Sequence, residues 1–246
     1  MWMDRAVFYQ CTRDASTVIA ELDRLAGLGI NGLLSSETRS PADAEAVERA
    51  AHRHGMRVSV GAALGIDATL EASCADYFDA HRGGDFGPFW SVFEPLHAAA
   101  TADAPVALRT ASVTAPPLSD GREREDLEVI CTFLLTWPVV PVIREGDEAG
   151  VESHLERLIY LRATEPDLGS GAALAYVPSC GGAPLLYRRG ESIAVALNPG
   201  SAAHSIELDH VGDAAPLLAH HCHLSRAGGR WTARIGPAGY GVFNVR

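Results

Sequence analysis

Several side chains that can carry out acid and base chemistry follow short apolar runs of the sequence. Glu37 and Glu145 are carboxylates of the kind that move protons, and Arg109 is a cation that can hold an anion or a hydroxyl group. These three are the catalytic candidates. A second set has polar groups suited to binding a ligand: Tyr9, Gln10, Asp67, His81, Arg144 and Asp147. Because groups at the carboxyl ends of parallel strands meet on one face of a barrel-like sheet, we expect the candidate site at that face.

Some of these residues also have a structural interpretation. Carboxylates at the start of a helix commonly cap it and pair with nearby arginines. This is the favoured explanation for Asp147 and Glu148, in the turn that begins at Gly146. For Glu37 and Arg109 the structural and the functional interpretation stay balanced.

Histidines raise two further questions. His81 precedes a pair of glycines in a segment that could line a pocket, although a glycine pair is more typical of a turn. Residues 220–223 read HHCH. Alternate residues of a strand point to opposite faces, so His221 and His223 could share a metal ion but all four side chains could not. We expect no metal there and no cofactor elsewhere.

The order of apolar runs predicts how the site is built. Strand-like runs alternate with helical segments through residue 164, as in α/β proteins whose right-handed crossovers make the strands parallel. Residues 68–81 fit either one helix or a helix that ends in a short strand at residues 74–78. The expected strands are residues 6–10, 30–35, 57–64, 106–113 and 139–143, and the other expected helices are residues 17–28, 41–55, 88–101, 122–137 and 151–164.

Beyond residue 167 the pattern changes to short runs separated by glycine and proline, several of which alternate apolar with polar residues. This is typical of half-buried antiparallel strands. The sequence therefore predicts two domains, a barrel-like one over residues 1–167 and a β-sandwich over residues 168–246. The expected strands of the second are residues 172–177, 184–187, 192–197, 203–208, 215–220, 231–235 and 240–245.

The amino-acid composition of the chain disfavours some classes of binding partner. The chain has 246 residues, 47% of them hydrophobic, and a net charge of −11, which is ordinary for a globular protein. An acidic surface disfavours nucleic acid and anionic membranes, because both are recognised by basic patches. The five cysteines are scattered and form no CxxC pair, so we expect reduced thiols. With no signal sequence or spanning segment recognised, a cytoplasmic location is predicted.

A series of segments in chain order carries a family resemblance. They are AVFYQ at residues 6–10, LDRLAGLGINGLLS at 22–35, AAHRHGMRVSV at 50–60, TFLLTWPVVPVIREGDEAG at 132–150, LIYLRATEPDL at 158–168, VALNP at 195–199 and GPAGYGVFNV at 236–245. They resemble the first strand, first helix, second and third strands, last helix, eighth strand and terminal β domain of the α-amylase superfamily, glycoside hydrolase family thirteen. The fourth segment, with its Gly-Asp-Glu turn, is the most specific.

The resemblance implies a truncated TIM-like (β/α) barrel of about five to six parallel strands, followed by a small antiparallel β domain. The resemblance also implies that the catalytic carboxylates of the family are missing from this chain. Members of the family attack the sugar with one carboxylate and use another as acid and base, on the fourth and fifth strands, with a third carboxylate on the seventh. Residues 65–104 are too short to hold the corresponding region, and residues 109–113 (RTASV) replace an Asn-His-Asp turn.

Three functional hypotheses follow. The leading one is a pseudoenzyme that binds a small polyhydroxylated or sugar-derived molecule at the strand ends without cleaving glycosides. The second is a repurposed enzyme that catalyses isomerisation, elimination or cyclisation of such a compound by acid and base. The third is a structural role, in which a homodimer contact or a partner chain covers the open edges of the sheet.

Overall fold

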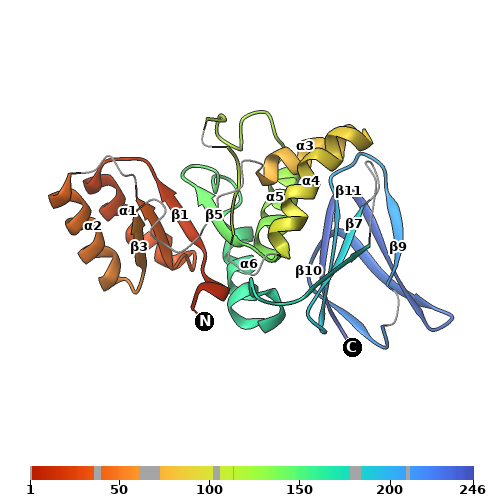
Figure 1. The fold of residues 1–246 in the computed structure, drawn as a ribbon. Coiled ribbons are helices and arrows are strands. Elements are labelled where there is room, and N and C mark those ends of the chain that lie inside the picture. Colours follow the sequence, from red (N-terminus) through yellow and green to blue (C-terminus); the bar gives the residue numbers. More distant parts are fainter. Residues whose placement is uncertain are drawn as a thin grey trace.

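The computed structural model describes residues 2–35, 40–60, 73–101, 106–112, 114–177, 184–208 and 211–246. A parallel sheet with its helices forms one part of the molecule, and an antiparallel sheet forms the other (Figure 1). This confirms the predicted fold class. Within the described residues, no helix combines the length and the apolar character needed to cross a membrane.

The parallel sheet has five strands in the order β3-β2-β1-β5-β4. Every neighbouring pair is parallel, as the crossover rule predicts. The strand β4 is shorter than the run predicted at residues 106–113, because the chain bends after Arg109. The strands are β1 (Phe8–Cys11), β2 (Gly32–Ser35), β3 (Arg57–Val60), β4 (Ala107–Arg109) and β5 (Val140–Arg144).

Side-chain caps fix where several helices begin. The side chains of Asp14 and Ser40 accept from the backbone amides of Thr17 and Asp43 and so start α1 and α2. The helices of this part are α1 (Ala15–Gly27), α2 (Pro41–Arg53), α3 (Cys74–Gly83), α4 (Phe86–Ala100), α5 (Arg124–Thr136) and α6 (Glu152–Thr164), with short 3-10 turns η1 (Trp2–Arg5) and η3 (Pro166–Leu168).

The structure settles the ambiguity over residues 68–81. Ser73 and Asp76 form a reciprocal capping box, so α3 begins there, and the alternative of a strand at residues 74–78 is wrong. From Cys74 onward the segment is helical, and residues 68–72 lie outside the described residues.

The two faces of the parallel sheet have different surroundings. Tyr9, Leu33 and Ile143 belong to the main core, which is shared with the helices and which defines the outer face. On the opposite face, here called the inner face, Phe8 packs in a small separate cluster together with Ala6, Ala107, Val140 and Val142. Gly32 makes this packing possible, because a Cβ at that position would lie 2.4 Å from the Phe8 ring.

The antiparallel sheet is organised around its last strand. The strand β11 pairs with β8, β9 and β10, and β7 and β6 extend the sheet beyond β8. Two strands predicted at residues 231–235 and 240–245 are one continuous strand in the structure, bent at Ala238, where φ is +46°. The strands are β6 (Leu174–Val177), β7 (Leu185–Arg189), β8 (Ile193–Asn198), β9 (His204–Leu208), β10 (Ala214–Ala227) and β11 (Arg230–Val245).

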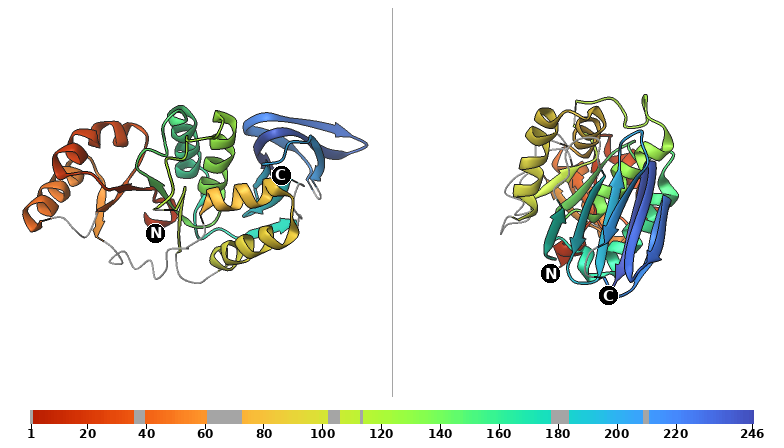
Figure 2. Two further views of the ribbon diagram at one scale, coloured as in Figure 1. Left: turned by 90° about the horizontal axis from the view of Figure 1, so that it is seen from above. Right: turned by 90° about the vertical axis from the view of Figure 1, so that its right-hand side faces the viewer.

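Helix α5 joins the two parts. It contacts α3 and α6 on one side and β8 and β11 on the other, and Figure 2 shows it between the parallel strands and the antiparallel sheet. The main core continues across this boundary, since Tyr187, Val195 and Val242 of the antiparallel sheet belong to the same cluster as Leu134 of α5. The two sheets therefore share one hydrophobic core.

Candidate functional site

The carboxyl ends of β1, β3, β4 and β5 place four polar side chains on the inner face. In-register partners on parallel strands point to the same side. Gln10 is in register with Arg144 and, through Leu34, with Ser59. Arg109 reaches the same face, because its Nε donates to Oε1 of Gln10 at 3.1 Å. We call Gln10, Ser59, Arg109 and Arg144 the strand-end site.

Arg109 has unused hydrogen-bonding capacity in this site. Its Nε holds Gln10, but within the described residues its Nη1 and Nη2 groups make neither a hydrogen bond nor an ion pair. The side chain is half-buried, and this burial lowers the pKa of the guanidinium from its ordinary value. Arg109 is therefore a partly desolvated cation whose planar fork can still bind a ligand.

Ser59 is a second group with unused capacity. The residue is 5% exposed, and its Oγ atom has no hydrogen-bond partner in the described part of the chain. A buried hydroxyl without a partner is uncommon and costs free energy. Sequence reasoning missed this residue, although strand alternation marks Ser59 as facing opposite to its neighbour Val58.

Arg144 has the opposite character, because its guanidinium is fully used within the protein. It pairs with Asp147 and also donates to the backbone carbonyls of Ser112, Ala115 and Pro116, each at 2.6 Å. Asp147 in turn accepts from the Thr110 hydroxyl at 2.5 Å. The pair fastens the loop that follows β4 to the turn that follows β5.

Glu145 is held by the segment that follows β1. Its Oε2 accepts from the backbone amide and the hydroxyl of Thr12 at 2.9 and 2.8 Å, and its Oε1 pairs with Nε of Arg13 at 2.9 Å. The carboxylate thus connects the ends of β1 and β5. It lies at the strand ends, as predicted, with both oxygens occupied by protein donors.

Tyr9 and Glu148 form a separate buried contact on the outer face. The Tyr9 hydroxyl donates to Glu148 at 2.7 Å, and Arg24 of α1 donates to the same oxygen at 2.9 Å. Burial, followed by the charge of Glu148, raises the pKa of Tyr9 well above its usual value. Tyr9 and Gln10 are neighbours in the chain and so point to opposite faces, which separates Tyr9 from the strand-end site.

The turn after β5 confirms one part of the structural interpretation and corrects another. Asp147 pairs with Arg144 and Glu148 with Arg24, as expected of carboxylates near arginines. Neither caps the next helix, because α6 begins at Glu152 after Val151 without a side-chain cap.

The remaining predicted residues lie elsewhere. His81 is fully buried on α3, with its Nδ1 2.9 Å from the Tyr77 hydroxyl and its ring against Phe89, so the helix core and not the strand ends surrounds it. Glu37 and Asp67 lie outside the described residues.

The histidine run lies on β10, away from the strand ends. Its alternation is broken at His221, which sits at a bulge with φ of +46° and stacks on His220. Among the described residues, no group of three or more His, Cys, Asp or Glu side chains could hold a metal ion.

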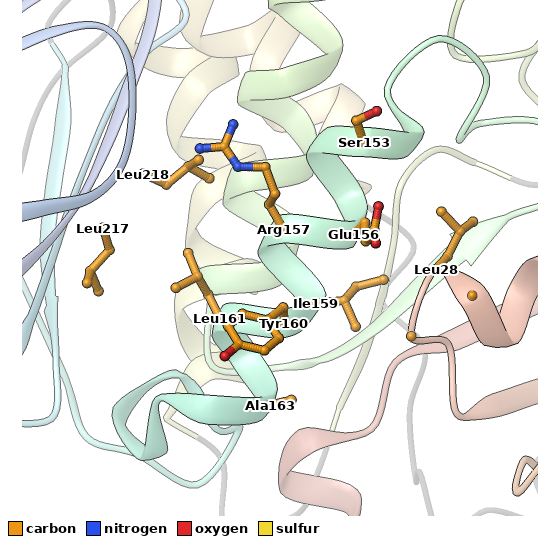
Figure 3. A pocket seen from close by; sticks show the side chains of 12 residues that line it. Leu28, Ser153, Glu156, Arg157, Ile159, Tyr160, Leu161, Ala163, Leu217 and Leu218 are labelled. Carbon is orange, nitrogen blue, oxygen red and sulfur yellow. The ribbon is translucent and has the colours of Figure 1, made fainter.

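A separate groove of about 700 Å³ lies on the outside of the molecule, along α6. Figure 3 shows Leu217 and Leu218 of β10 on one side of the helix and Leu28 on the other, with Arg157 and Tyr160 of α6 between them. None of the residues predicted for the site lines this groove.

The sequence matches no protein-family model, and no curated protein sequence is similar enough to count as a match. The fold, in contrast, is similar to several solved structures. It superposes on trehalose-6-phosphate hydrolase of Bacillus licheniformis with a TM-score of 0.69 and 10% identity, covering 99% of each chain. It superposes on isomaltulose synthase of Klebsiella sp. LX3 with a TM-score of 0.68 and 9% identity, covering 100% of each chain.

A third structure, the α-amylase of H. orenii, has a TM-score of 0.59 and 12% identity, and the match covers 94% of this chain but only 64% of that one. At these identities the similarity concerns the fold. The protein therefore has the fold of α-amylase-family enzymes, which confirms the resemblance expected from the sequence at the level of architecture.

Proposed function

We propose that this protein is a shortened relative of the α-amylase family that binds a small polyhydroxylated or sugar-derived molecule at the strand-end site and does not hydrolyse glycosides. The observation that supports binding is the presence of polar groups without internal partners on the inner face. Arg109 and Ser59 offer donors and an acceptor there, and Gln10 orients Arg109. Hydroxyl-rich ligands are recognised by such groups.

The contacts of the carboxylates support the proposal that the protein does not hydrolyse glycosides. Retaining glycosidases need two carboxyl groups about 5 Å apart, one to attack and one to donate a proton. The described carboxylates of the turn after β5 are Glu145, Asp147 and Glu148, and each is bound to an arginine and to at least one further donor. A carboxylate held in this way stabilises the structure and is poorly placed to form a bond with a sugar carbon.

Isothermal titration calorimetry with glucose, maltotriose, trehalose and an aminocyclitol tests the binding. We expect at least one of them to bind the native protein and to bind the Gln10→Ala variant more weakly, because Arg109 then loses the group that orients it. Glu207→Ala, an exposed change on β9, is the matched control and leaves binding unchanged.

An assay with 4-nitrophenyl α-glucoside tests the absence of hydrolysis. No release of nitrophenol above the uncatalysed rate is expected. Release at an enzymatic rate that a single Asp or Glu change abolishes would overturn the proposal. So would the failure of these four compounds and of their phosphate and carboxylate derivatives to bind.

A further inference from the structure

The charged groups around the carboxyl ends of the parallel strands are not evenly balanced. Arg13, Arg24 and Arg144 each pair with a carboxylate of the turn after β5, at 2.9, 2.9 and 2.7 Å respectively. Arg109 lies at the same ends of the strands and has only the neutral amide oxygen of Gln10 as a hydrogen-bond partner in the described part of the chain. The site is therefore left with one cation that no described carboxylate neutralises.

Two other buried arginines, Arg162 and Arg189, also form no ion pair in the described part of the chain, but backbone carbonyls accept from their Nη atoms. Arg109 differs from both, because its Nη1 and Nη2 atoms have no acceptor among the described residues. A partly desolvated charge costs free energy unless an opposite charge accompanies it. Burial also lowers the pKa of Arg109, which is the response of a cation that lacks a compensating anion.

The geometry of the guanidinium indicates what can supply the missing charge. With Nε committed to Gln10, the two terminal nitrogens Nη1 and Nη2 remain as a pair of donors in one plane. Such a pair matches two oxygens of a carboxylate or a phosphate, and the resulting charge-assisted bonds are about twice as strong as neutral ones. The hydroxyl of Ser59 lies on the same inner face, on β3 at the other edge of the sheet.

We infer that the ligand of the strand-end site is an anionic sugar derivative, a phosphate ester or a carboxylate of a polyhydroxylated compound, whose acidic group binds the Nη1 and Nη2 atoms of Arg109. The inference rests on the proposed function and specifies its ligand. Gln10 acts as a positioning residue that holds the guanidinium through Nε. A neutral sugar has no acidic group that could bind the Nη1 and Nη2 atoms of Arg109.

Calorimetry with four probes tests the inference: glucose 6-phosphate, glucuronate, glucose and inorganic phosphate. We expect at least one of the two acidic sugars to bind about tenfold more tightly than glucose, the effect of one charge-assisted contact. The acid that binds more tightly identifies the group as phosphate or carboxylate. The preference should weaken when NaCl is raised from about 0.02 M to about 0.5 M, because salt screens a partly exposed ion pair.

Two variants assign the preference to Arg109. Arg109→Gln should bind glucose and the acidic sugars equally, and Arg109→Lys should keep part of the preference, since it retains the charge but loses the planar fork. Arg230→Gln makes the same charge change on β11, where the side chain is 77% exposed, and should keep the full preference. Circular dichroism establishes that each variant is folded.

Four results would overturn the inference. They are equal binding of glucose and both acids by the native protein, a preference that survives in Arg109→Gln, a preference that salt does not change, and inorganic phosphate that binds as tightly as glucose 6-phosphate. The first of these leaves the proposed function intact, because a neutral sugar still binds. Failure of every sugar to bind overturns both proposals.

Discussion

Arg144 and Asp147 form a buried two-point contact, with Nη2 2.7 Å from Oδ1 and Nε 3.1 Å from Oδ2. Both side chains are at most 8% exposed. Arg144 also binds three backbone carbonyls of the loop after β4, and Asp147 binds the backbone amide of Leu118 in the same loop at 2.9 Å. Two residues three positions apart thus hold in place a loop that follows a different strand.

Removal of one member of this pair should destabilise the protein strongly. In Asp147→Ala the buried guanidinium of Arg144 loses its counter-charge, and we expect the free energy of unfolding to fall by about 3 to 5 kcal/mol. Urea denaturation measures this loss in the free energy of unfolding. Glu207→Ala, which breaks the exposed pair with Arg230, should cost less than about 1 kcal/mol. Equal losses in the two variants would contradict this account.

Acidification should destabilise the protein through His154. This residue is buried between α5 and β11, where Nε2 lies 3.0 Å from the Thr132 hydroxyl and Nδ1 lies 3.3 Å from the Tyr240 hydroxyl. Burial lowers its pKa from 6.5 to about 4, while the nearby carboxylate of Glu128 opposes the shift. The unfolded chain therefore binds a proton between pH 6.5 and 4 that the folded chain does not.

The free energy of unfolding should accordingly decrease as the pH falls from 6.5 to about 4, with a contribution from His154 of at most about 1.4 kcal/mol per pH unit. Urea denaturation at a series of pH values measures the slope. In His154→Gln the slope should be shallower, whereas His52→Gln, a change on the exposed face of α2, should leave it unchanged. An unchanged slope in His154→Gln would exclude this residue as the source.

Gly32 should not tolerate a methyl group. In Gly32→Ala the new Cβ would meet the Phe8 ring at 2.4 Å, and the ring is fully buried on the inner face, so we expect a loss of about 1 to 3 kcal/mol. Gly27→Ala is the control, because nothing lies within 4 Å of its Cβ position and alanine favours a helix. Thermal unfolding should show a lower midpoint for the first variant only. The Phe8→Leu change should partly rescue Gly32→Ala by making room.

The two sheets should unfold together, because one core spans both. Arg189 of β7 strengthens this link by donating to the carbonyls of Thr136 in α5 and Gly169, and the Tyr187 hydroxyl lies 2.5 Å from that of Thr136. Scanning calorimetry should show one transition with equal calorimetric and van't Hoff enthalpies. Two resolved transitions would show that the parts are energetically independent.

The sequence was a good guide to the order of the elements, because hydrophobic period distinguishes helices from strands reliably in long segments. The sequence was a poorer guide to where individual elements begin or bend, because particular side chains and strand pairings determine this. The capping box of Ser73 and Asp76 was visible in the sequence and would have identified α3 without a strand. The glycines and the proline around Ala238 indicated a break, yet β10 pairs with β11 on both sides of the bend.

The sequence predicted that Gln10, Arg109, Arg144 and Glu145 lie together at the carboxyl ends of the strands, and the structure places them there. It did not predict the contacts of each side chain. The partners of each side chain depend on tertiary contacts that sequence does not display, such as the loop carbonyls bound by Arg144. Only the structure distinguishes an arginine that is fully occupied from one that is not.

The strand β11 is the only described strand that pairs with three others, so most of the antiparallel sheet is anchored to a single stretch of backbone. Amide hydrogens in its second half, around Val242 and Phe243, are shielded by strands on both sides and by buried side chains. Their exchange with deuterium should require global unfolding, which makes them a direct reporter of the stability of the whole molecule.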